Sequence, residues 1–282
     1  MTVVDTVDPW TGEVDSLRQQ AFEALSVVLD PELDEPITDL GFIRSLVVSP
    51  HGDELELHLR LPTSFCSPNF AYLMCSDSKD VLVALPWTSR VVVELDDHHD
   101  SALINAGMAA DAGYLGTFGH EAEQDLDELR ETFRRKAHTA AMERVLTAWL
   151  KGDADRSIEQ LTSVTLADLP ADRTTDALLR RRSALDLPAE PDAVVFVDHT
   201  GRAYSAEEVP MALRRARSTR VSIDGNAHFC RGLLRTRYAG SGADQTFRPE
   251  GAEEADATYV TSPDDPTFIP LTTMFPTRSK ES

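Results

Sequence analysis

DPEL at residues 30–33 closes an amphipathic segment, and LRLPTSFCSP at residues 59–68 places a single cysteine, Cys66, directly before a predicted helix. Ser67 is a residue type that caps helix N-termini, and Pro68 suits the first helical position. A thiolate at the positive end of a helix is stabilised by the helix dipole. We therefore predict a reactive Cys66 with a pKa below that of a free cysteine and below that of Cys75. The other interpretation is that Cys66 packs as a small buried hydrophobe.

The residues around these two stretches predict a small three-stranded sheet with helices on one face. Residues 42–48 and 54–61 flank a turn at residues 49–53, and leucines alternate strictly with polar residues along the second segment. This alternation is typical of a strand with one buried face. Apolar residues recur at helical spacing over residues 17–29 until Asp30-Pro31. A second helix over residues 68–84 and a closing strand over residues 90–95 complete the unit.

At these positions the chain resembles the small metal–sulfur (iron–sulfur) cluster assembly domain family that includes the SufT and PaaD-type proteins. The resemblance covers roughly residues 17–97. It rests on the first helix, the DPEL loop, the turn at residues 37–41, the loop with Cys66 and the last strand, residues 91–95. Two positions depart from the family pattern: Pro62 stands where threonine is usual, and Ser67 separates Cys66 from Pro68.

The resemblance implies a binding site centred on Cys66. In this family the cysteine of this loop is presented to iron or to a cluster, so Cys66 is the expected metal ligand and would hold iron or an iron–sulfur cluster transiently. Asp30, Glu32 and Asp39 would shape or neutralise the site, and the hydroxyl of Thr63 can hydrogen-bond sulfur or a bound ion. A small number of ligands would keep the affinity modest, so that the metal can leave.

Other cysteines and histidines give weaker metal-site signals. Cys75 would lie about 10 Å along the second helix from its start, so we assign it to the core face of that helix. The adjacent histidines His98 and His99 lie on an extended chain and point to opposite sides, which favours a solvated linker. His228 and Cys230 could form half of a metal site, but no second ligand pair has the matching spacing.

Charge is distributed unevenly along the 282 residues. The formal net charge of −21 argues against nucleic acid as a partner, because phosphate binding needs a concentrated positive surface. Residues 178–238 nevertheless hold 11 Arg against 7 Asp and Glu. This excess predicts either a solvated helical surface or a docking face for the acidic remainder of the chain or for an acidic partner.

Beyond the resembling part, the pattern predicts further units and an overall α+β fold. Residues 1–16 are expected to form an irregular arm, and residues 98–187 a mainly helical region whose longest helix covers residues 125–150. Residues 188–240 predict a small α/β unit, with strands at residues 194–197 and 220–223 and helices at residues 206–217 and 228–238. Residues 241–282 have few aliphatic side chains and predict a flexible acidic tail.

These observations favour an accessory protein over an enzyme. No apolar run approaches bilayer length, no signal peptide is recognisable, and three widely spaced cysteines do not suggest a disulfide framework. We expect a cytoplasmic protein, with no membrane or nucleic-acid partner. No phosphate-binding glycine loop and no hydrolase or metalloprotease motif is present.

We therefore predict an iron–sulfur or iron-centre maturation factor with two kinds of partner, a dedicated metalloenzyme client and the cluster assembly machinery. Because PaaD-type relatives are associated with multicomponent oxygenases, the resemblance implies a client of that kind. A homodimer is compatible with the pattern. The alternative, which the departures at Pro62 and Ser67 favour, is a metal-free adaptor or regulatory subunit of an enzyme complex.

Overall fold

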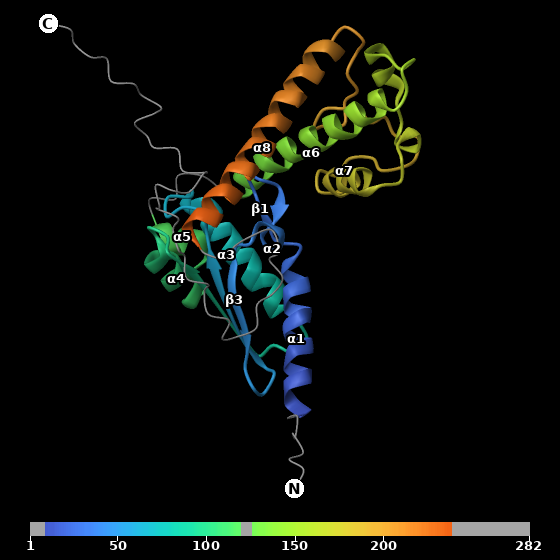
Figure 1. Cartoon of the computed structure of the whole chain (residues 1–282). Helices are drawn as coiled ribbons and strands as arrows, with labels where there is room; N and C mark the ends of the chain where they lie inside the picture. The colour runs from blue at the N-terminus through green and yellow to red at the C-terminus, as the bar shows by residue number, and fades with distance from the viewer. Residues whose placement is uncertain (1–8, 120–125, 239–282) are drawn as a thin grey trace, which may run out of the picture.

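The computed structural model describes residues 9–119 and 126–238 and has the predicted α+β fold (Figure 1). Its sheet consists of β3 (Ile43–Val48), β4 (Glu54–Arg60) and β5 (Arg90–Asp96), in that order. β3 pairs antiparallel with β4, whereas β5 pairs parallel with β4 after the crossover helix α3 (Pro68–Val83). The predicted alternation is confirmed, since Leu55, Leu57 and Leu59 are each no more than 2% exposed.

Helices α1 (Pro9–Leu25) and α3 cover the same face of this sheet. They contact each other, α1 also contacts β3, and α3 contacts β5. The helix α1 begins earlier than predicted, so residues 9–16 of the expected irregular arm are helical, while residues 1–8 lie outside the described residues. Most side chains at residues 13–16 are exposed. Residues 13–16 therefore lack the row of buried apolar side chains from which a helix is predicted.

The DPEL segment forms the turn of a very short hairpin rather than the end of α1. Strands β1 (Leu29–Asp30) and β2 (Glu35–Pro36) pair antiparallel across it. The one-turn helix α2 (Ile37–Leu40) follows and ends at Gly41, whose φ of 79° is the left-handed conformation that glycine adopts without strain. We call residues 30–35 the acidic loop, because it carries Asp30, Glu32, Asp34 and Glu35.

Two short helices extend this sheet domain beyond β5. Helix α4 (Ser101–Ala109) packs on β5, and α5 (Gly113–Phe118) packs on α4. Aromatic rings of α3 and α5 contact each other there, with Tyr72 lying 5.4 Å from Tyr114 and 5.8 Å from Phe118 between ring centroids. The first part of the region that we predicted to be mainly helical thus belongs to the same hydrophobic core as the sheet.

A second hydrophobic core lies among the helices that follow. Helix α6 (Leu126–Lys151) contacts α7 (Arg173–Ser183) and α8 (Val209–Arg237), and the 3-10 turns η2 (Ile158–Ser163) and η3 (Leu166–Asp168) lie between α6 and α7 in the chain. Buried side chains from all of these elements form this core, including Leu146, Leu161, Leu178 and Leu213. The apolar face of α6 therefore packs within the chain itself.

The prediction of a strand at residues 220–223 was wrong, because this stretch lies inside the 29-residue helix α8. The small α/β unit expected at residues 188–240 is instead a segment of turns and bends, with isolated bridges at Val194 and Val197, followed by one helix. Gly225 explains the error. Glycine after Asp224 is typical of a turn, but here a Cβ added at Gly225 would meet no atom within 4 Å, so the residue lies on an open helix surface.

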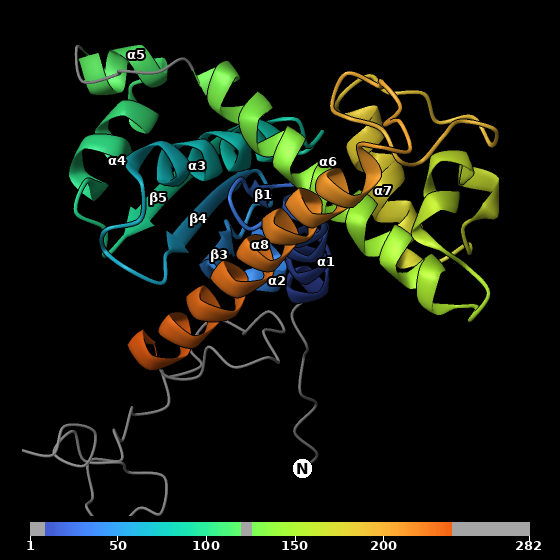
Figure 2. The same cartoon turned by 90° about the horizontal axis from the view of Figure 1, so that it is seen from above.

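Helix α8 connects the two cores. Its first half packs on α6, and its second half lies across the sheet domain (Figure 2). Leu213 and Ala216 belong to the core of the helical region, whereas Ala227 and Leu234 belong to the core that contains the sheet. None of the helices in the described part of the chain combines the length and the apolar character that crossing a bilayer requires.

Candidate functional site

Cys66 lies in the loop between β4 and α3, close to the acidic loop. Helix α3 begins at Pro68 as predicted, with Ser67 at the N-cap position. Burial, together with the nearby acidic groups of Asp30, Cys230 and Glu32, raises the pKa of Cys66 to about 12. The prediction of a lowered pKa was therefore wrong. The backbone N–H of Ser67 favours the thiolate, but loss of water and repulsion between like charges outweigh this effect.

Contacts from the chain after β5 fix the Cys66 loop. Nδ1 of His98 accepts a hydrogen bond from the backbone N–H of Asp100 at 3.1 Å, so Nε2 carries the proton and donates to the Cys66 carbonyl at 2.9 Å. The backbone N–H of His99 donates to the Ser64 carbonyl at 2.9 Å. His98 is only 7% exposed. The expected solvated linker is thus wrong for His98, which anchors the loop and has no ring nitrogen left for a metal.

The hydroxyl groups of the loop also serve its conformation. Oγ1 of Thr63 accepts a hydrogen bond from the backbone N–H of Phe65 at 3.1 Å. Oγ of Ser64 accepts one from the guanidinium of Arg237 at 2.8 Å, and the same guanidinium donates to the Leu61 carbonyl at 3.1 Å. Thr63 therefore shapes the loop that carries Cys66.

Of the predicted carboxylates, Asp30 and Glu32 lie close enough to act on the Cys66 thiol. Asp30 is 4% exposed, and burial raises its pKa to about 6 even though its Oδ1 accepts the backbone N–H groups of Glu32 and Leu33, each at 2.9 Å. Asp39 is exposed, accepts a hydrogen bond from Thr38, and is not among the groups whose charge shifts the pKa of Cys66.

Helix α8 adds residues that sequence reasoning did not place at this site. Asn226 donates to Oε1 of Glu32 at 3.1 Å, and Arg231 forms an ion pair with Glu35. Cys230 lies beside Arg231 and influences the pKa of Cys66. The only sequence signal was the pair His228 and Cys230, which we considered as half of a metal site. His228 is exposed, so it does not lie at the site with the half-buried Cys230.

The remaining cysteine has the predicted structural role. Cys75 is fully buried on the core face of α3, together with Ala71, Met74 and Leu82. Its surroundings are apolar, and burial raises its pKa to about 12. It is therefore a suitable control for experiments on the other two thiols.

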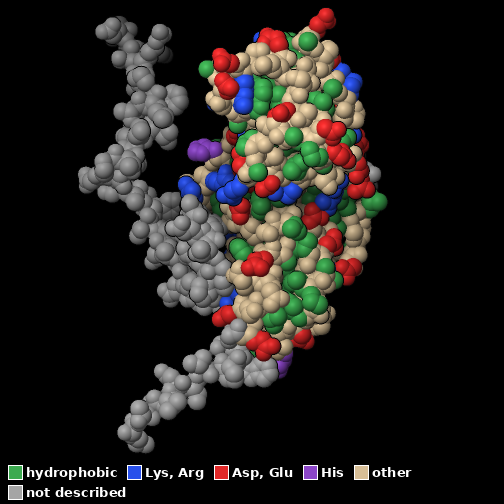
Figure 3. All heavy atoms as spheres, turned by 90° about the vertical axis from the view of Figure 1, so that its right-hand side faces the viewer, with side chains coloured by type: hydrophobic (Ala, Val, Ile, Leu, Met, Phe, Trp, Pro, Cys, Tyr) green, Lys and Arg blue, Asp and Glu red, His purple; other side chains and the backbone are tan. Residues whose placement is uncertain are grey.

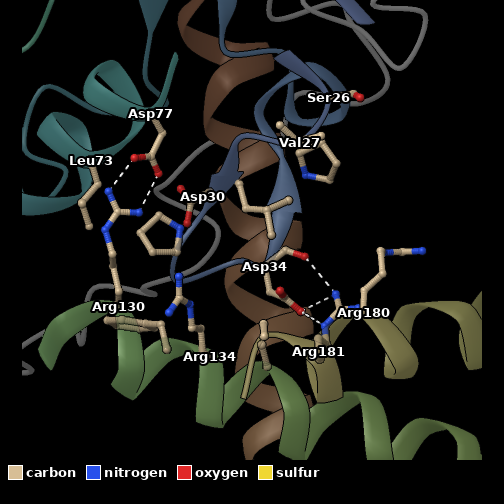
Figure 4. Close-up of a pocket in the computed structure, with 16 residues that line it drawn as sticks. Ser26, Val27, Asp30, Asp34, Leu73, Asp77, Arg130, Arg134, Arg180 and Arg181 are labelled. Carbon is tan, nitrogen blue, oxygen red and sulfur yellow. Dashed lines mark hydrogen bonds and ion pairs between the residues drawn. The ribbon is translucent and has the colours of Figure 1, made fainter. Parts of the chain in front are cut away.

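A cleft lies between the acidic loop and helices α3, α6 and α7 (Figure 4). Its volume is about 530 Å³. Arg130 is paired with Asp77, and Arg181 with Asp34, whereas Arg134 and Arg180 line the cleft and form no ion pair within residues 9–119 and 126–238. Figure 4 shows Arg134 pointing from α6 toward the loop that carries Asp30. The lining also includes apolar side chains from the sheet domain and α6, namely Val27, Leu29, Leu73 and Phe133.

The arginine excess of residues 178–238 thus docks in part against the acidic remainder of the chain. Arg181 and Arg231 bind the acidic loop, and Arg217 and Arg220 bind the buried Glu143 of α6. In Figure 3, Lys and Arg side chains form a band across the middle of the face, where the helical region meets the sheet domain. Some of these arginines therefore dock against acidic residues of the chain, as one interpretation predicted. Others lie on a solvated helical surface, as the other interpretation predicted.

Comparison with known proteins identifies the sheet domain. Residues 18–95 match the family model described as "Iron-sulfur cluster assembly protein". These residues form an iron–sulfur cluster assembly domain. The predicted family resemblance is confirmed, and the assembly domain supports a general role in iron–sulfur cluster assembly.

Two similar proteins extend the comparison of the assembly domain. The chain is 28% identical over 84 residues to "Fe-S cluster assembly factor HCF101, chloroplastic" of Oryza sativa subsp. japonica. The match covers 30% of this chain and 15% of that protein, so the chain spans only a small part of the relative's length. A crystal structure of the domain of unknown function DUF59 from Bacillus anthracis covers 30% of this chain and 78% of its own, at 21% identity and a TM-score of 0.28.

The residues at the site suit a thiophilic cargo but offer few ligands. Within the described ranges, no group of three or more His, Cys, Asp or Glu side chains is arranged to hold a metal ion. Soft thiol donors, of the kind that iron and its clusters prefer, come from Cys66 and Cys230.

Asp30→Asn should stabilise the protein at neutral pH. The pKa of Asp30 is about 6 in the folded chain against 3.8 for an exposed carboxyl, so the wild type loses stability as the pH rises from about 4 to about 6. An amide avoids the buried charge and still accepts both backbone N–H bonds. We expect the free energy of unfolding at pH 7.5 to rise by roughly 1–3 kcal/mol, with the difference disappearing near pH 4.

Urea unfolding at a series of pH values measures this difference. Asp39→Asn is the matched control, because Asp39 is exposed and the substitution should change little at any pH. A less stable Asp30→Asn protein at pH 7.5 would show that the Asp30 carboxylate is favoured by its surroundings, contrary to this account.

Proposed function

We propose that the chain is a maturation factor that holds iron or an iron–sulfur cluster transiently at Cys66 and transfers it to a dedicated metalloenzyme client. The observation that supports this most directly is the position of Cys66. It lies in the assembly domain on a loop held by His98 on one side and Arg237 on the other. A fixed loop presents its sulfur in one orientation, which suits the capture of a cargo that binds soft donors.

The protonation of the thiol makes binding reversible. A metal replaces the thiol proton when it binds, and the raised pKa of Cys66 makes this replacement costly at neutral pH. The cost lowers the affinity for the cargo. Low affinity is what a carrier needs, because the cargo must move on to the client. Asp30 and Glu32 add negative potential that favours a cationic cargo over an anionic one.

Transfer requires a partner protein to reach the site. Phe65, which directly precedes Cys66, is 81% exposed, and its ring lies tilted against that of His99 with ring centroids 6.0 Å apart. An exposed aromatic side chain beside the thiol gives an incoming protein an apolar contact. We assign this approach to the cluster assembly machinery that would load the chain.

Client recognition is assigned to the cleft between the assembly domain and the helical region. Val27 and Leu29 are 67% and 40% exposed beside it, and Arg134 and Arg180 offer positive charge there. This combination suits a client segment that carries both acidic and apolar side chains. The family resemblance to PaaD-type proteins makes a multicomponent oxygenase the client class that we propose.

A metal-free adaptor is the second candidate function. The absence of a three-ligand group among the described residues and the raised pKa of Cys66 both favour it. In that case the fold would recognise the client through shape and charge, and Cys66 would contribute only packing.

Metal analysis separates the two candidates. Full-length chain purified without oxygen, after co-expression with a cluster assembly system, should contain iron and acid-labile sulfide. Cys66→Ser should lose at least about nine-tenths of both, because serine is a hard, weakly acidic donor. Cys75→Ser should keep them, and thermal unfolding should show both variants folded. Equal iron in wild type and Cys66→Ser, or none in either, would leave only the adaptor.

Charge reversal tests the client surface. In cells that lack the native protein, Arg134→Glu combined with Arg180→Glu should reduce the iron content and activity of the client oxygenase several-fold, because like charges would repel an acidic client segment. Arg214→Glu, on the exposed side of α8 away from the cleft, serves as the control and should support normal activity. Full activity of the double variant would place client recognition elsewhere.

A further inference from the structure

Cys230 lies on the face of α8 that is turned toward the assembly domain. Asn226, four residues earlier, reaches Glu32 of the acidic loop at 3.1 Å. Arg237, seven residues later, reaches the Leu61 carbonyl at 3.1 Å and Oγ of Ser64 at 2.8 Å. Residues separated by four and seven positions share one face of a helix. The side of α8 that carries Cys230 therefore spans both the acidic loop and the loop with Cys66.

The burial of the two thiols supports the same placement. Cys66 and Cys230 are both half-buried, and both pack against the hydrophobic core of the assembly domain. The carboxyl groups of Asp30 and Glu32 act electrostatically on both thiols, and Cys230 acts on Cys66. Two cysteines that lie 164 positions apart in the sequence thus share one acidic environment.

We propose that Cys66 and Cys230 form a single two-thiol site, which joins the assembly domain to α8 and binds a thiophilic metal ion. That this ion is iron, alone or in a cluster, rests on the proposed function. Each thiol releases its proton to solvent as its sulfur–metal bond forms, and no oxidation state changes. Exchange of the two protons for a divalent ion leaves the net charge of the site unchanged, so the preference for the ion rests on the soft sulfur donors.

The site makes α8 part of the cargo-binding unit. With two sulfur ligands, a metal that prefers four-fold coordination keeps two positions for a donor or an acceptor protein. The same helix packs on α6, which lines the client cleft. Binding of the cargo would therefore hold α8 against the assembly domain and link the loaded site to the helical region.

A trivalent arsenical tests the thiol pair without iron. Phenylarsine oxide bridges two neighbouring thiols with loss of one water and does not bridge isolated ones. Intact mass spectrometry of the reduced full-length chain should show one bridged arsenical per chain. Cys66→Ser and Cys230→Ser should each abolish the bridge, whereas Cys75→Ala should retain it. Peptide mapping of the wild type should place the bridge between the peptides that contain Cys66 and Cys230.

An unbridged wild type, or a bridge that survives in Cys230→Ser, would overturn the proposal. Thermal unfolding verifies each variant, and Cys230→Ala replaces the serine variant if that protein does not fold. A Co²⁺ titration should also show the sulfur-to-metal absorption falling by about half in each single variant, with an affinity at least tenfold lower. A positive arsenical result in a chain that never acquires iron or sulfide would support the site while contradicting the proposed carrier function.

Discussion

The arrangement of the site depends on the polar contacts that hold the acidic loop against the C-terminal half. Asn226 binds Glu32, Arg181 binds Asp34, and Arg231 binds Glu35. These contacts are partly buried and charge-assisted, so removing one partner leaves the other charge poorly solvated. The loop that carries Asp30 thus has its position set by α7 and α8, and the geometry around Cys66 is a property of the whole chain rather than of the assembly domain alone.

The local electrostatics explain why the site suits a cation. Burial and the carboxyl groups of Asp30 and Glu32 keep both thiols protonated at neutral pH. Arg231 and Arg237 of α8 are engaged with Glu35 and with the Cys66 loop. A positive ion can therefore relieve the acidic surroundings of the thiols. On the cleft side of the acidic loop, Arg134 and Arg180 form no ion pair within residues 9–119 and 126–238, and they lie beside the carboxyl groups of Asp30, Asp34 and Asp77.

The elements that the sequence predicted well are those whose pattern is local. Alternating leucines predicted β4, the proline after Ser67 predicted the start of α3, and helical spacing placed Cys75 in the core. The errors come from contacts between distant segments. The pKa of Cys66 was predicted from the helix that follows it, but its value is determined by burial and by residues of the acidic loop and α8. The contribution of Cys230 was hidden because its partners lie far away in the sequence.

Hydrogen exchange tests most directly whether α8 holds the acidic loop in place. The comparison is between wild type and a full-length variant with Asn226→Ala and Arg231→Ala, with Arg214→Ala as the control. The account predicts clearly faster exchange of backbone amides in residues 29–40 of the double variant only, because the acidic loop loses its contacts with α8, whereas the loop at residues 61–66 keeps its contacts with Arg237. Unchanged exchange in residues 29–40 would contradict it and would show that the contacts with α8 do not hold this loop in place.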